Sequence, residues 1–167
     1  DISAMRTEHV ARVSELTRRT TQFNMTTLMR SSDEVEALLS SAVTKALVVH
    51  VRDRFGDYGL VGAVFYKEQE QSLAVETFLL SCRVLGRGVE HRLLNELGRI
   101  GAERGLRYVD LTWIETARNA PARAFLERSC VQSRWVEGSI EGGARYRVPV
   151  QDAMSLAVGS EPSAQDM

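Results

Sequence analysis

The sequence predicts an α/β domain in which helices cover both faces of one mixed, mostly antiparallel sheet. Hydrophobic residues recur at helical spacing near the N-terminus, and from Ala46 to Leu80 they alternate with other residues as in strands. Beyond Leu80, helical and strand-like stretches follow each other in turn, an order that places helices against a sheet. The 167 residues are enough for one such domain, and 44% of hydrophobic residues is an ordinary value for a globular protein.

Two helices are expected before residue 40. The first runs from Met5 to Thr20, where apolar residues share one face and arginine and glutamate residues lie between them. The next stretch, TQFNMTTLM, is rich in threonine and broken by Asn24, which favours a turn that leads into a short strand. Ser32 and the two acidic residues after it then mark the start of a second, short helix through Leu39.

Three consecutive strands are expected in the middle of the chain, at residues 46–53, 60–66 and 72–80. The stretches between them, RFGDYG and KEQEQ, have lengths that suit antiparallel hairpins. A helix then begins near Val89 and ends at Gly105, because apolar residues recur at helical spacing and glycine commonly follows the end of a helix. The remaining elements are a strand at 107–114, a helix at 120–128, and a hairpin of strands 133–140 and 144–150 around EGG.

The end of the chain differs in composition from the rest. It reads SLAVGSEPSAQDM, in which small, polar and proline residues show no apolar period. We therefore expect a folded domain over residues 1–150 and a C-terminal linker or tail over residues 151–167. The chain begins with Asp1 rather than Met, and we expect it to be one piece of a longer polypeptide.

The totals argue against several classes of function. A formal net charge of -1 gives no global basic field, so we expect no nucleic-acid partner. No apolar run approaches the roughly 20 residues of a membrane helix, so we expect no membrane partner. Cys82 and Cys130 lie far apart and show no C-x-x-C spacing, so neither a bound metal nor a disulfide framework is expected. We place the protein in the reducing cytoplasm.

A glycine-containing turn joins the third strand to the central helix and is the strongest local motif. Its pattern is Arg83-x-x-Gly86-x-Gly88, with Leu85 and Arg87 at the intervening positions. Glycines allow the backbone to approach a phosphate closely, and the N–H groups at a helix N-terminus point toward an anion. The turn is therefore a candidate phosphate-binding loop. Turn geometry and packing alone are the plainer interpretation of the same glycines.

This motif resembles the acyl-carrier loop of the GNAT acyltransferase superfamily. A second stretch, Asn119-x-x-Ala122-x-x-Phe125-Leu126, is similar to that superfamily's Asn-x-x-Ala-x-x-Phe-Tyr on the following helix. The resemblance implies a GNAT-like fold and a site for coenzyme A or for the phosphopantetheine arm of a carrier protein. It also implies that Asn119 contacts the pantetheine, whereas helix capping is the alternative that needs no ligand.

Four segments show a narrower resemblance, to the C-terminal region of FkbH-type proteins of polyketide biosynthesis. They read RRTTQFNMTT, RDRFGDYGLVG, FLLSCRVLGRGVE and ARNAPARAFLE. These bifunctional glyceryl transferase/phosphatases load a glyceryl unit onto an acyl carrier protein. The resemblance implies an acyl carrier protein as partner, and a HAD-type phosphatase domain in the same or a partner chain. The phosphatase motif Asp-x-Asp-x-Thr is not present in this sequence.

Cys82 and Glu76 are the candidate catalytic residues. A thiol at the end of a strand can accept an acyl group and pass it to a carrier thiol, and a helix N-terminus with Arg83 or Arg87 favours the thiolate. The alternative for Cys82 is a small buried core residue. Alternation along the strand places Glu76 on the same face as Phe78 and Cys82, as a general base or hydroxyl-binding group; the alternative is an ion-paired residue.

These residues predict acyl transfer to or from a carrier-protein thiol, and three alternatives stay open. The first is an acetyl-CoA-dependent N-acetyltransferase, against which Leu126 counts mildly because leucine cannot donate a proton to a departing thiolate. Tyr108 or Tyr146 can serve as a replacement donor, although packing is the plainer interpretation of either. The second is a non-catalytic module that docks a carrier protein, and the third is a decarboxylating loading domain. A cluster of Arg12, Arg18 and Arg19 can meet an acidic carrier surface, although a solvated helix face explains it equally.

Overall fold

The structure, a computed structural model, describes residues 1–130, 134–135 and 140–156. The strands are β1 (Ile2–Ala4), β2 (Thr44–Asp53), β3 (Gly56–Glu68), β4 (Ser72–Leu80), β5 (Tyr108–Ile114), β6 (Arg134–Trp135) and β7 (Gly143–Pro149). The α-helices are α1 (Val10–Arg19), α2 (Ser32–Ser40), α3 (Val89–Glu103), α4 (Ala120–Ser129) and α5 (Val150–Met154), with 3-10 turns η1 (Thr7–His9) and η2 (Cys82–Val84).

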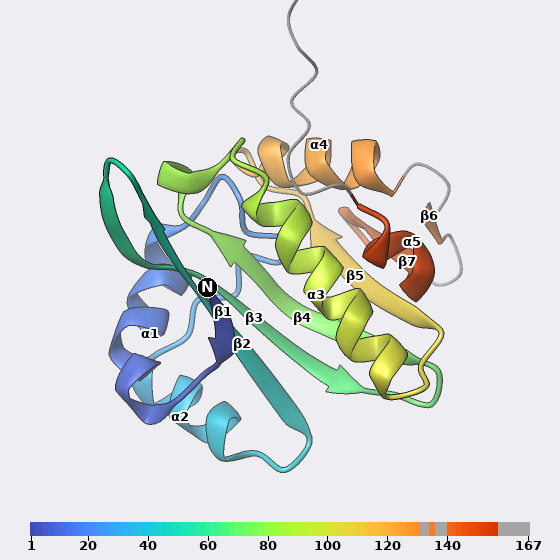
Figure 1. Cartoon of the computed structure of the whole chain (residues 1–167), viewed down its shortest axis with the longest axis horizontal. Helices are drawn as coiled ribbons and strands as arrows, with labels where there is room; N and C mark the ends of the chain where they lie inside the picture. Colours follow the sequence, from blue (N-terminus) through green and yellow to red (C-terminus); the bar gives the residue numbers. More distant parts are fainter. Residues whose placement is uncertain (131–133, 136–139, 157–167) are drawn as a thin grey trace, which may run out of the picture.

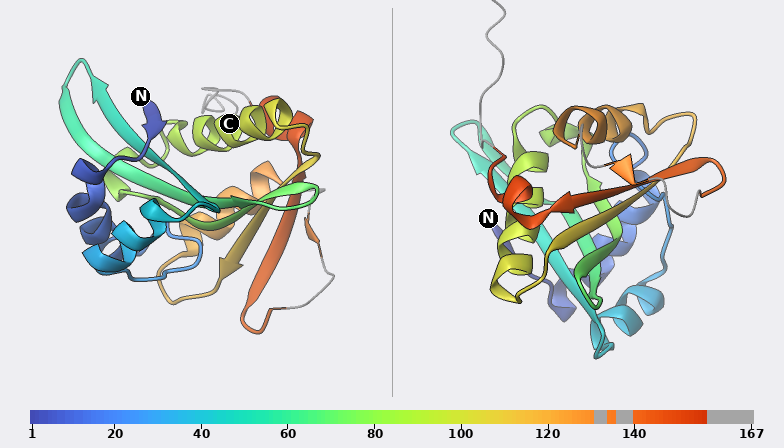
Figure 2. Two further views of the ribbon diagram at one scale, coloured as in Figure 1. Left: turned by 90° about the horizontal axis from the view of Figure 1, so that it is seen from below. Right: turned by 90° about the vertical axis from the view of Figure 1, so that its right-hand side faces the viewer.

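All the described strands form one sheet, in the order β1-β2-β3-β4-β5-β7-β6 (Figure 1). Its pairs are antiparallel except β4 with β5. Helices α1 and α2 cover one face and α3 with α5 the other (Figure 2). The predicted α/β class, with helices on both faces of a mixed sheet, is confirmed. None of the described helices has the length and apolar character needed to cross a membrane.

The central meander of β2, β3 and β4 follows the predicted strands, with a tighter first hairpin. β3 begins at Gly56, so most of the expected RFGDYG loop belongs to the strand pair. β3 and β4 shift register between Phe65 and Tyr66, and Glu76 is left without a partner across this bulge. A bulge reverses which side chains face which side of the sheet. This reversal decides where Glu76 points.

Two short elements were not predicted, and one predicted strand does not form. β1 pairs with β2 at the edge of the sheet, and α5 follows β7 directly. The TQFNMTTLM stretch forms an isolated bridge between Asn24 and Leu79 instead of a regular strand. Of the predicted strand 133–140, residues 133 and 136–139 lie outside the described residues, while Arg134–Trp135 pairs with β7 as expected.

Helix α5 corrects the predicted end of the folded domain. Val150 and Ala153 are buried, and α5 packs against α3 with Gly98 at the contact. Leu156 also packs against the core. The ordered part therefore extends past residue 150, and five residues are too few to show a helical period in the sequence. Residues 157–167 of the predicted tail lie outside the described residues.

The contact between α3 and α5 predicts a specific cost for enlarging Gly98. A Cβ at this position would lie 2.7 Å from the Ala153 Cβ and 3.0 Å from the Val150 carbonyl oxygen. We expect Gly98→Ala to lower the free energy of unfolding by about 1–2 kcal/mol in urea denaturation, because overpacking outweighs the better helix propensity of alanine. Arg92→Ala, on an exposed part of α3, is the control and should change it by less than about 0.5 kcal/mol. Unchanged stability of Gly98→Ala would contradict the docking of α5.

Candidate functional site

Strands β4 and β5 separate halfway along their length. Their parallel pairing runs from Ser72 with Tyr108 to Val75 with Leu111 and goes no further. The remaining half of β4 keeps its pairing with β3 on one edge only. Backbone N–H and C=O groups on the other edge therefore need partners from elsewhere. We call this opening the β4–β5 split.

The chain itself fills the β4–β5 split with residues Phe23–Met25, the inserted segment. The Met25 N–H donates to the carbonyl of Phe78 at 3.1 Å, and the Leu80 N–H donates to the carbonyl of Phe23 at 2.9 Å. On the other side, the Ile114 N–H donates to the carbonyl of Met25 at 2.8 Å. The inserted segment thus bonds to β4 and to β5, and it closes the sheet where the two strands diverge.

Aromatic packing holds the inserted segment in place. Phe23 makes edge-to-face contacts with Phe78 and Phe125, with ring centroids 5.6 and 5.5 Å apart. His91 of α3 lies edge-on to Phe125, with centroids at 5.1 Å. Phe23 and Met25 are both buried. The sequence predicts a turn with a buried aromatic residue at Phe23, and its burial is confirmed. The partners of its ring are distant along the chain and were not predicted.

Asn119 anchors the inserted segment to β5. Its side chain is fully buried, and its Nδ2 donates to the carbonyls of Asn24 at 3.2 Å and Ile114 at 2.7 Å. Its Oδ1 accepts from the Thr116 N–H at 2.9 Å. Asn119 is the N-cap residue of α4, as the capping alternative predicts, but its side chain makes no capping hydrogen bond. Contact with a pantetheine arm would require these bonds to open.

The glycine loop has the backbone that the sequence predicts. Gly86 and Gly88 adopt φ values of 74° and 75°, in the left-handed region that glycine favours, and Gly88 is the N-cap of α3. Leu85 is partly buried against the core. The Gly86 N–H, however, donates to Glu90 Oε1 at 3.3 Å. Glu90 is only 8% exposed, so a carboxylate of the chain already lies where an anion is favoured by the helix dipole.

Arg87 is also engaged within the chain. Its guanidinium lies 2.6 Å from an Asp53 carboxylate oxygen and stacks over the ring of Tyr58. The pKa of Asp53 is lowered, chiefly by the N–H of Phe55 and further by Arg87. Arg87 and Gly88 line a cavity of about 220 Å³ between β2 and the start of α3. Cys82 does not line this cavity.

Cys82 and Arg83 lie in a different cavity, of about 560 Å³, between η2 and the C-terminal part of α1. Cys82 is exposed, so its alternative as a buried core residue is wrong. The rest of the lining comes from α1, the residues that follow it, and the start of η2: Arg12, Leu16, Arg19, Thr20, Thr21, Gln22 and Ser81. We call it the Cys82 cavity. The structure therefore separates Cys82 and Arg83 from the rest of the predicted loop.

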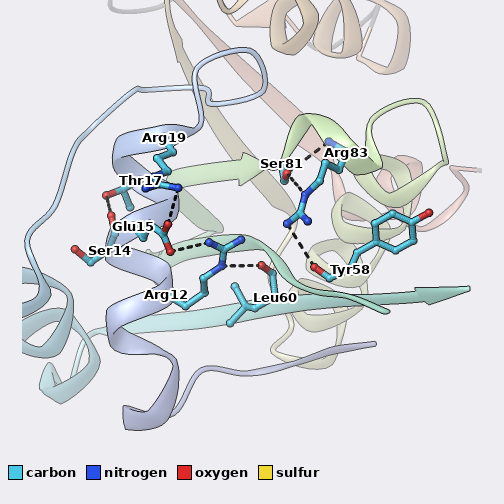
Figure 3. A network of polar contacts seen from close by, with 9 residues as sticks. All are labelled: Arg12, Ser14, Glu15, Thr17, Arg19, Tyr58, Leu60, Ser81 and Arg83. Carbon is cyan, nitrogen blue, oxygen red and sulfur yellow. Dashed lines mark hydrogen bonds and ion pairs between the residues drawn. The ribbon is translucent and has the colours of Figure 1, made fainter. Parts of the chain in front are cut away.

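Three arginines, Arg12, Arg19 and Arg83, line the Cys82 cavity. Figure 3 shows their polar contacts. Arg12 and Arg19 share one carboxylate, that of Glu15. Arg83 reaches from η2 to Ser81 Oγ and to the carbonyl of Tyr58, both at 3.5 Å. No carboxylate pairs with Arg83 among the described residues. Three arginines thus line the same cavity as an exposed thiol, and Glu15, which pairs with two of them, is not among the lining residues. Arg18 of the predicted arginine cluster does not line it.

Glu76 is placed away from the Cys82 cavity. Its carboxylate lies 2.6 Å from the ammonium of Lys67 and 3.9 Å from the guanidinium of Arg30. The Arg30 guanidinium lies over Phe65, in the core between the sheet and helices α1 and α2. Phe78 packs in the core on the other face. The predicted shared face of Glu76 and Phe78 is therefore wrong, because the bulge at Glu76 reverses the alternation.

The resemblance places the phosphates of coenzyme A at the glycine loop and its pantetheine arm at Asn119, and the residues present do not fit either group. The phosphates would meet the buried carboxylate of Glu90, and the arm would meet an amide that is already bonded to the inserted segment and to Ile114. The described residues also contain no group of three or more histidine, cysteine, aspartate or glutamate residues arranged to hold a metal ion. Of the two cysteines, Cys82 is exposed and Cys130 is buried.

Comparisons with known proteins show the fold. No family model and no curated protein matches the chain. The solved structure of smu.2055 from Streptococcus mutans is similar at a TM-score of 0.66 and 15% identity, covering 90% of this chain and 99% of that one. The GNAT domain of S. lividans PAT gives 0.65 and 15%, covering 89% of each. The ribosomal-protein-S18-alanine N-acetyltransferase of Escherichia coli gives 0.62 and 14%, covering 90% and 93%. The predicted GNAT-like fold is confirmed.

The role of Asn119 predicts a large stability cost when its amide is removed. Asn119→Ala leaves the Thr116 N–H and two carbonyls, of Asn24 and Ile114, without their partner. We expect the free energy of unfolding to fall by about 3 kcal/mol in urea denaturation. Asn95→Ala removes one exposed hydrogen bond to Met154 and should cost less than about 1 kcal/mol. Equal costs for the two variants would contradict the anchoring role.

The two cysteines are expected to differ sharply in reactivity. Burial raises the pKa of Cys130 to about 12, so this thiol stays protonated and unreactive near neutral pH. With iodoacetamide at about pH 8, we expect Cys82 to be alkylated about a hundredfold faster or more, as read by peptide mass spectrometry. Urea should bring the two rates together. Faster labelling of Cys130 in the folded protein would contradict the placement of both thiols.

The same pKa predicts how stability depends on pH. The ordinary value of 9.0 applies to Cys130 in the unfolded chain, and about 12 applies in the folded protein. Between these values only the unfolded chain loses the thiol proton, so the free energy of unfolding falls as pH rises. Well below a pH of about 9 the Cys130 thiol is protonated in both states, so it does not make the free energy of unfolding depend on pH. Cys130→Ala should weaken this alkaline fall in urea denaturation, and an unchanged slope would contradict the buried neutral thiol.

Proposed function

We propose that this chain transfers an acyl group between thiols, with Cys82 as the nucleophile. The observation that carries the proposal is an exposed thiol in a cavity lined by three arginines. The fold supports acyl transfer in general. The resemblance of four segments to FkbH-type proteins supports a glyceryl or related unit, carried on the phosphopantetheine arm of an acyl carrier protein. A HAD-type phosphatase domain, in the same or a partner chain, would supply the acyl unit in the cytoplasm.

The reaction is an exchange of one thioester for another. The Cys82 thiolate attacks the carbonyl carbon of the carrier-bound acyl group and forms a new C–S bond. The C–S bond to the pantetheine sulfur breaks, and the pantetheine thiolate leaves and takes up a proton. A second exchange in the reverse sense passes the acyl group to another carrier thiol. The bonds broken and made are alike, so each step is close to balanced and needs no oxidant.

The arginines of the Cys82 cavity bind and orient the substrate in this proposal. Arg83 has no carboxylate partner among the described residues, and a guanidinium binds a phosphate through paired hydrogen bonds. It is the candidate contact for the phosphate of the carrier arm. Arg12 and Arg19 face the same opening from α1. Their charge steers the encounter with an acidic carrier surface more than it adds affinity.

Transfer of an acetyl group from coenzyme A to an amine is the second candidate function. The fold supports it equally well. A cavity of about 260 Å³ near the end of β5 is lined by Trp113, Glu115 and Glu127, and by Arg123. The Arg123 guanidinium lies over the Trp113 ring and pairs with Glu127, so Glu115 is the carboxylate there that is left for an ammonium group. The poor fit of the loop and split to coenzyme A favours the first candidate. Leu126, buried and without a proton to give, favours it further.

Intact-protein mass spectrometry with a glyceryl-loaded carrier protein tests the Cys82 mechanism. We expect a glyceryl-sized adduct on the wild type and none on Cys82→Ala, because the alanine offers no sulfur for a thioester. Cys130→Ala is the matched control and should keep the adduct, since that thiol is buried.

Other outcomes point to the rival functions. Carrier binding without an adduct on the wild type would mean a docking module and would sink the covalent mechanism. Acetyl transfer to an amine that Cys82→Ala leaves intact would identify the N-acetyltransferase.

Arg83 predicts a separate kinetic effect. Removing its guanidinium takes away the proposed contact with the arm's phosphate, so Arg83→Ala should slow acylation of Cys82 by about tenfold or more at low carrier concentration. Arg18→Ala, outside the Cys82 cavity, is the control and should leave the rate within about twofold. Rapid-quench mass spectrometry measures both. Equal rates for Arg83→Ala and wild type would remove Arg83 from the substrate site.

A further inference from the structure

We infer that the β4–β5 split is permanently closed, so that the domain does not bind coenzyme A through the loop and split of its fold. The inserted segment takes the place of an extended ligand, and Glu90 takes the place of its phosphates. This inference goes beyond the proposed thiol exchange and does not rest on it. It concerns the β4–β5 split and Glu90 beside the glycine loop, and the mechanism proposed for Cys82 uses neither.

Backbone N–H and C=O groups that an extended ligand would use at the split are already hydrogen-bonded to the inserted segment. An extended ligand binds a strand edge by pairing its amides with free N–H and C=O groups. Here the Leu80 N–H, the Phe78 carbonyl and the Ile114 N–H all pair with the inserted segment. The pantetheine arm is an extended chain with amide groups and needs such partners. Entry of the arm would therefore require expulsion of the inserted segment.

Expulsion is opposed at both ends of the inserted segment. The Asn24 Nδ2 donates to the carbonyl of Thr20 at 3.2 Å, and its Oδ1 accepts from the Thr27 N–H at 2.9 Å. Just after the segment, Thr26 Oγ1 donates to the carbonyl of Glu76 in β4 at 2.9 Å. Phe23 is only 2% exposed and its ring is enclosed by two others. The inserted segment therefore belongs to the core and is no mobile plug.

Glu90 blocks anion binding at the glycine loop without any contribution from the inserted segment. Its Oε1 accepts from the Gly86 N–H, and its Oε2 is buried with no hydrogen-bond partner among the described residues. The carboxylate stands in the first turn of α3, where the helix dipole favours a negative charge. A pyrophosphate brought to the Gly86 N–H would meet a buried like charge. Gly86 and Gly88 keep the left-handed backbone of a phosphate-binding loop, but the carboxylate of Glu90 takes the place of the bound anion.

Amide NMR of the wild-type protein tests the closed split directly. In a titration with coenzyme A, we expect no saturable shift at the amides of Met25 and Ile114, and unchanged hydrogen-exchange protection of these amides. Leu80 is left out because it directly precedes Ser81 of the Cys82 cavity. Saturable shifts at Met25 and Ile114, with loss of Met25 protection, would overturn the inference, because they would show the arm displacing the inserted segment. The experiment needs no variant and involves no acyl group, so its outcome is separate from the fate of Cys82.

The nucleotide 3′,5′-ADP, which resembles one end of coenzyme A, tests the loop. We expect Glu90→Gln to tighten its binding by about tenfold or more, because a like charge is removed. Coenzyme A should bind this variant no more tightly than 3′,5′-ADP, since the arm gains nothing from a closed split. Glu96→Gln, on the same helix and paired with Arg99, is the control. Equal affinity in wild type and Glu90→Gln, or tighter binding of coenzyme A, would contradict the inference.

Discussion

The divergence of β4 and β5 is the constraint on which the rest of the structure depends. Two parallel strands that separate halfway leave backbone groups that cannot stay unpaired in a core. This chain satisfies them with Phe23–Met25, a segment that lies far before both of the strands it bonds to, β4 and β5. The aromatic cluster around Phe23 and the buried amide of Asn119 follow from that choice, because both keep the inserted segment in the sheet.

Residues that are close in the sequence line two different cavities on either side of the glycine turn. Cys82 and Arg83 open into the Cys82 cavity beside α1, whereas Arg87 and Gly88 line the cavity between β2 and α3. The first cavity offers an exposed thiol with cations, and the second is next to a loop that holds the chain's own carboxylate. The thiol exchange that we propose therefore takes place in the Cys82 cavity and not at Gly86 and Gly88.

Features set by local physics were predictable from the sequence. Alternation of apolar residues placed β2, β3 and β4, and the need for left-handed backbone placed Gly86 and Gly88. Features set by distant partners were not. The bulge that turns Glu76 toward Lys67 depends on pairing across β3, and the contact of Asn119 with Asn24 spans 95 residues. Glu90 lies two residues after Gly88 in the sequence, but only the structure shows that its carboxylate is buried and bonded to the loop.

A crystal structure of a cross-linked complex tests the central claim most directly. A carrier protein whose pantetheine ends in a bromoacetamide would be trapped on the exposed thiol. We predict a covalent bond to Cys82, with the arm in the Cys82 cavity near Arg83 and the inserted segment still bonded to β4 and β5. An arm that instead lies between β4 and β5, with Phe23–Met25 displaced, would contradict the account.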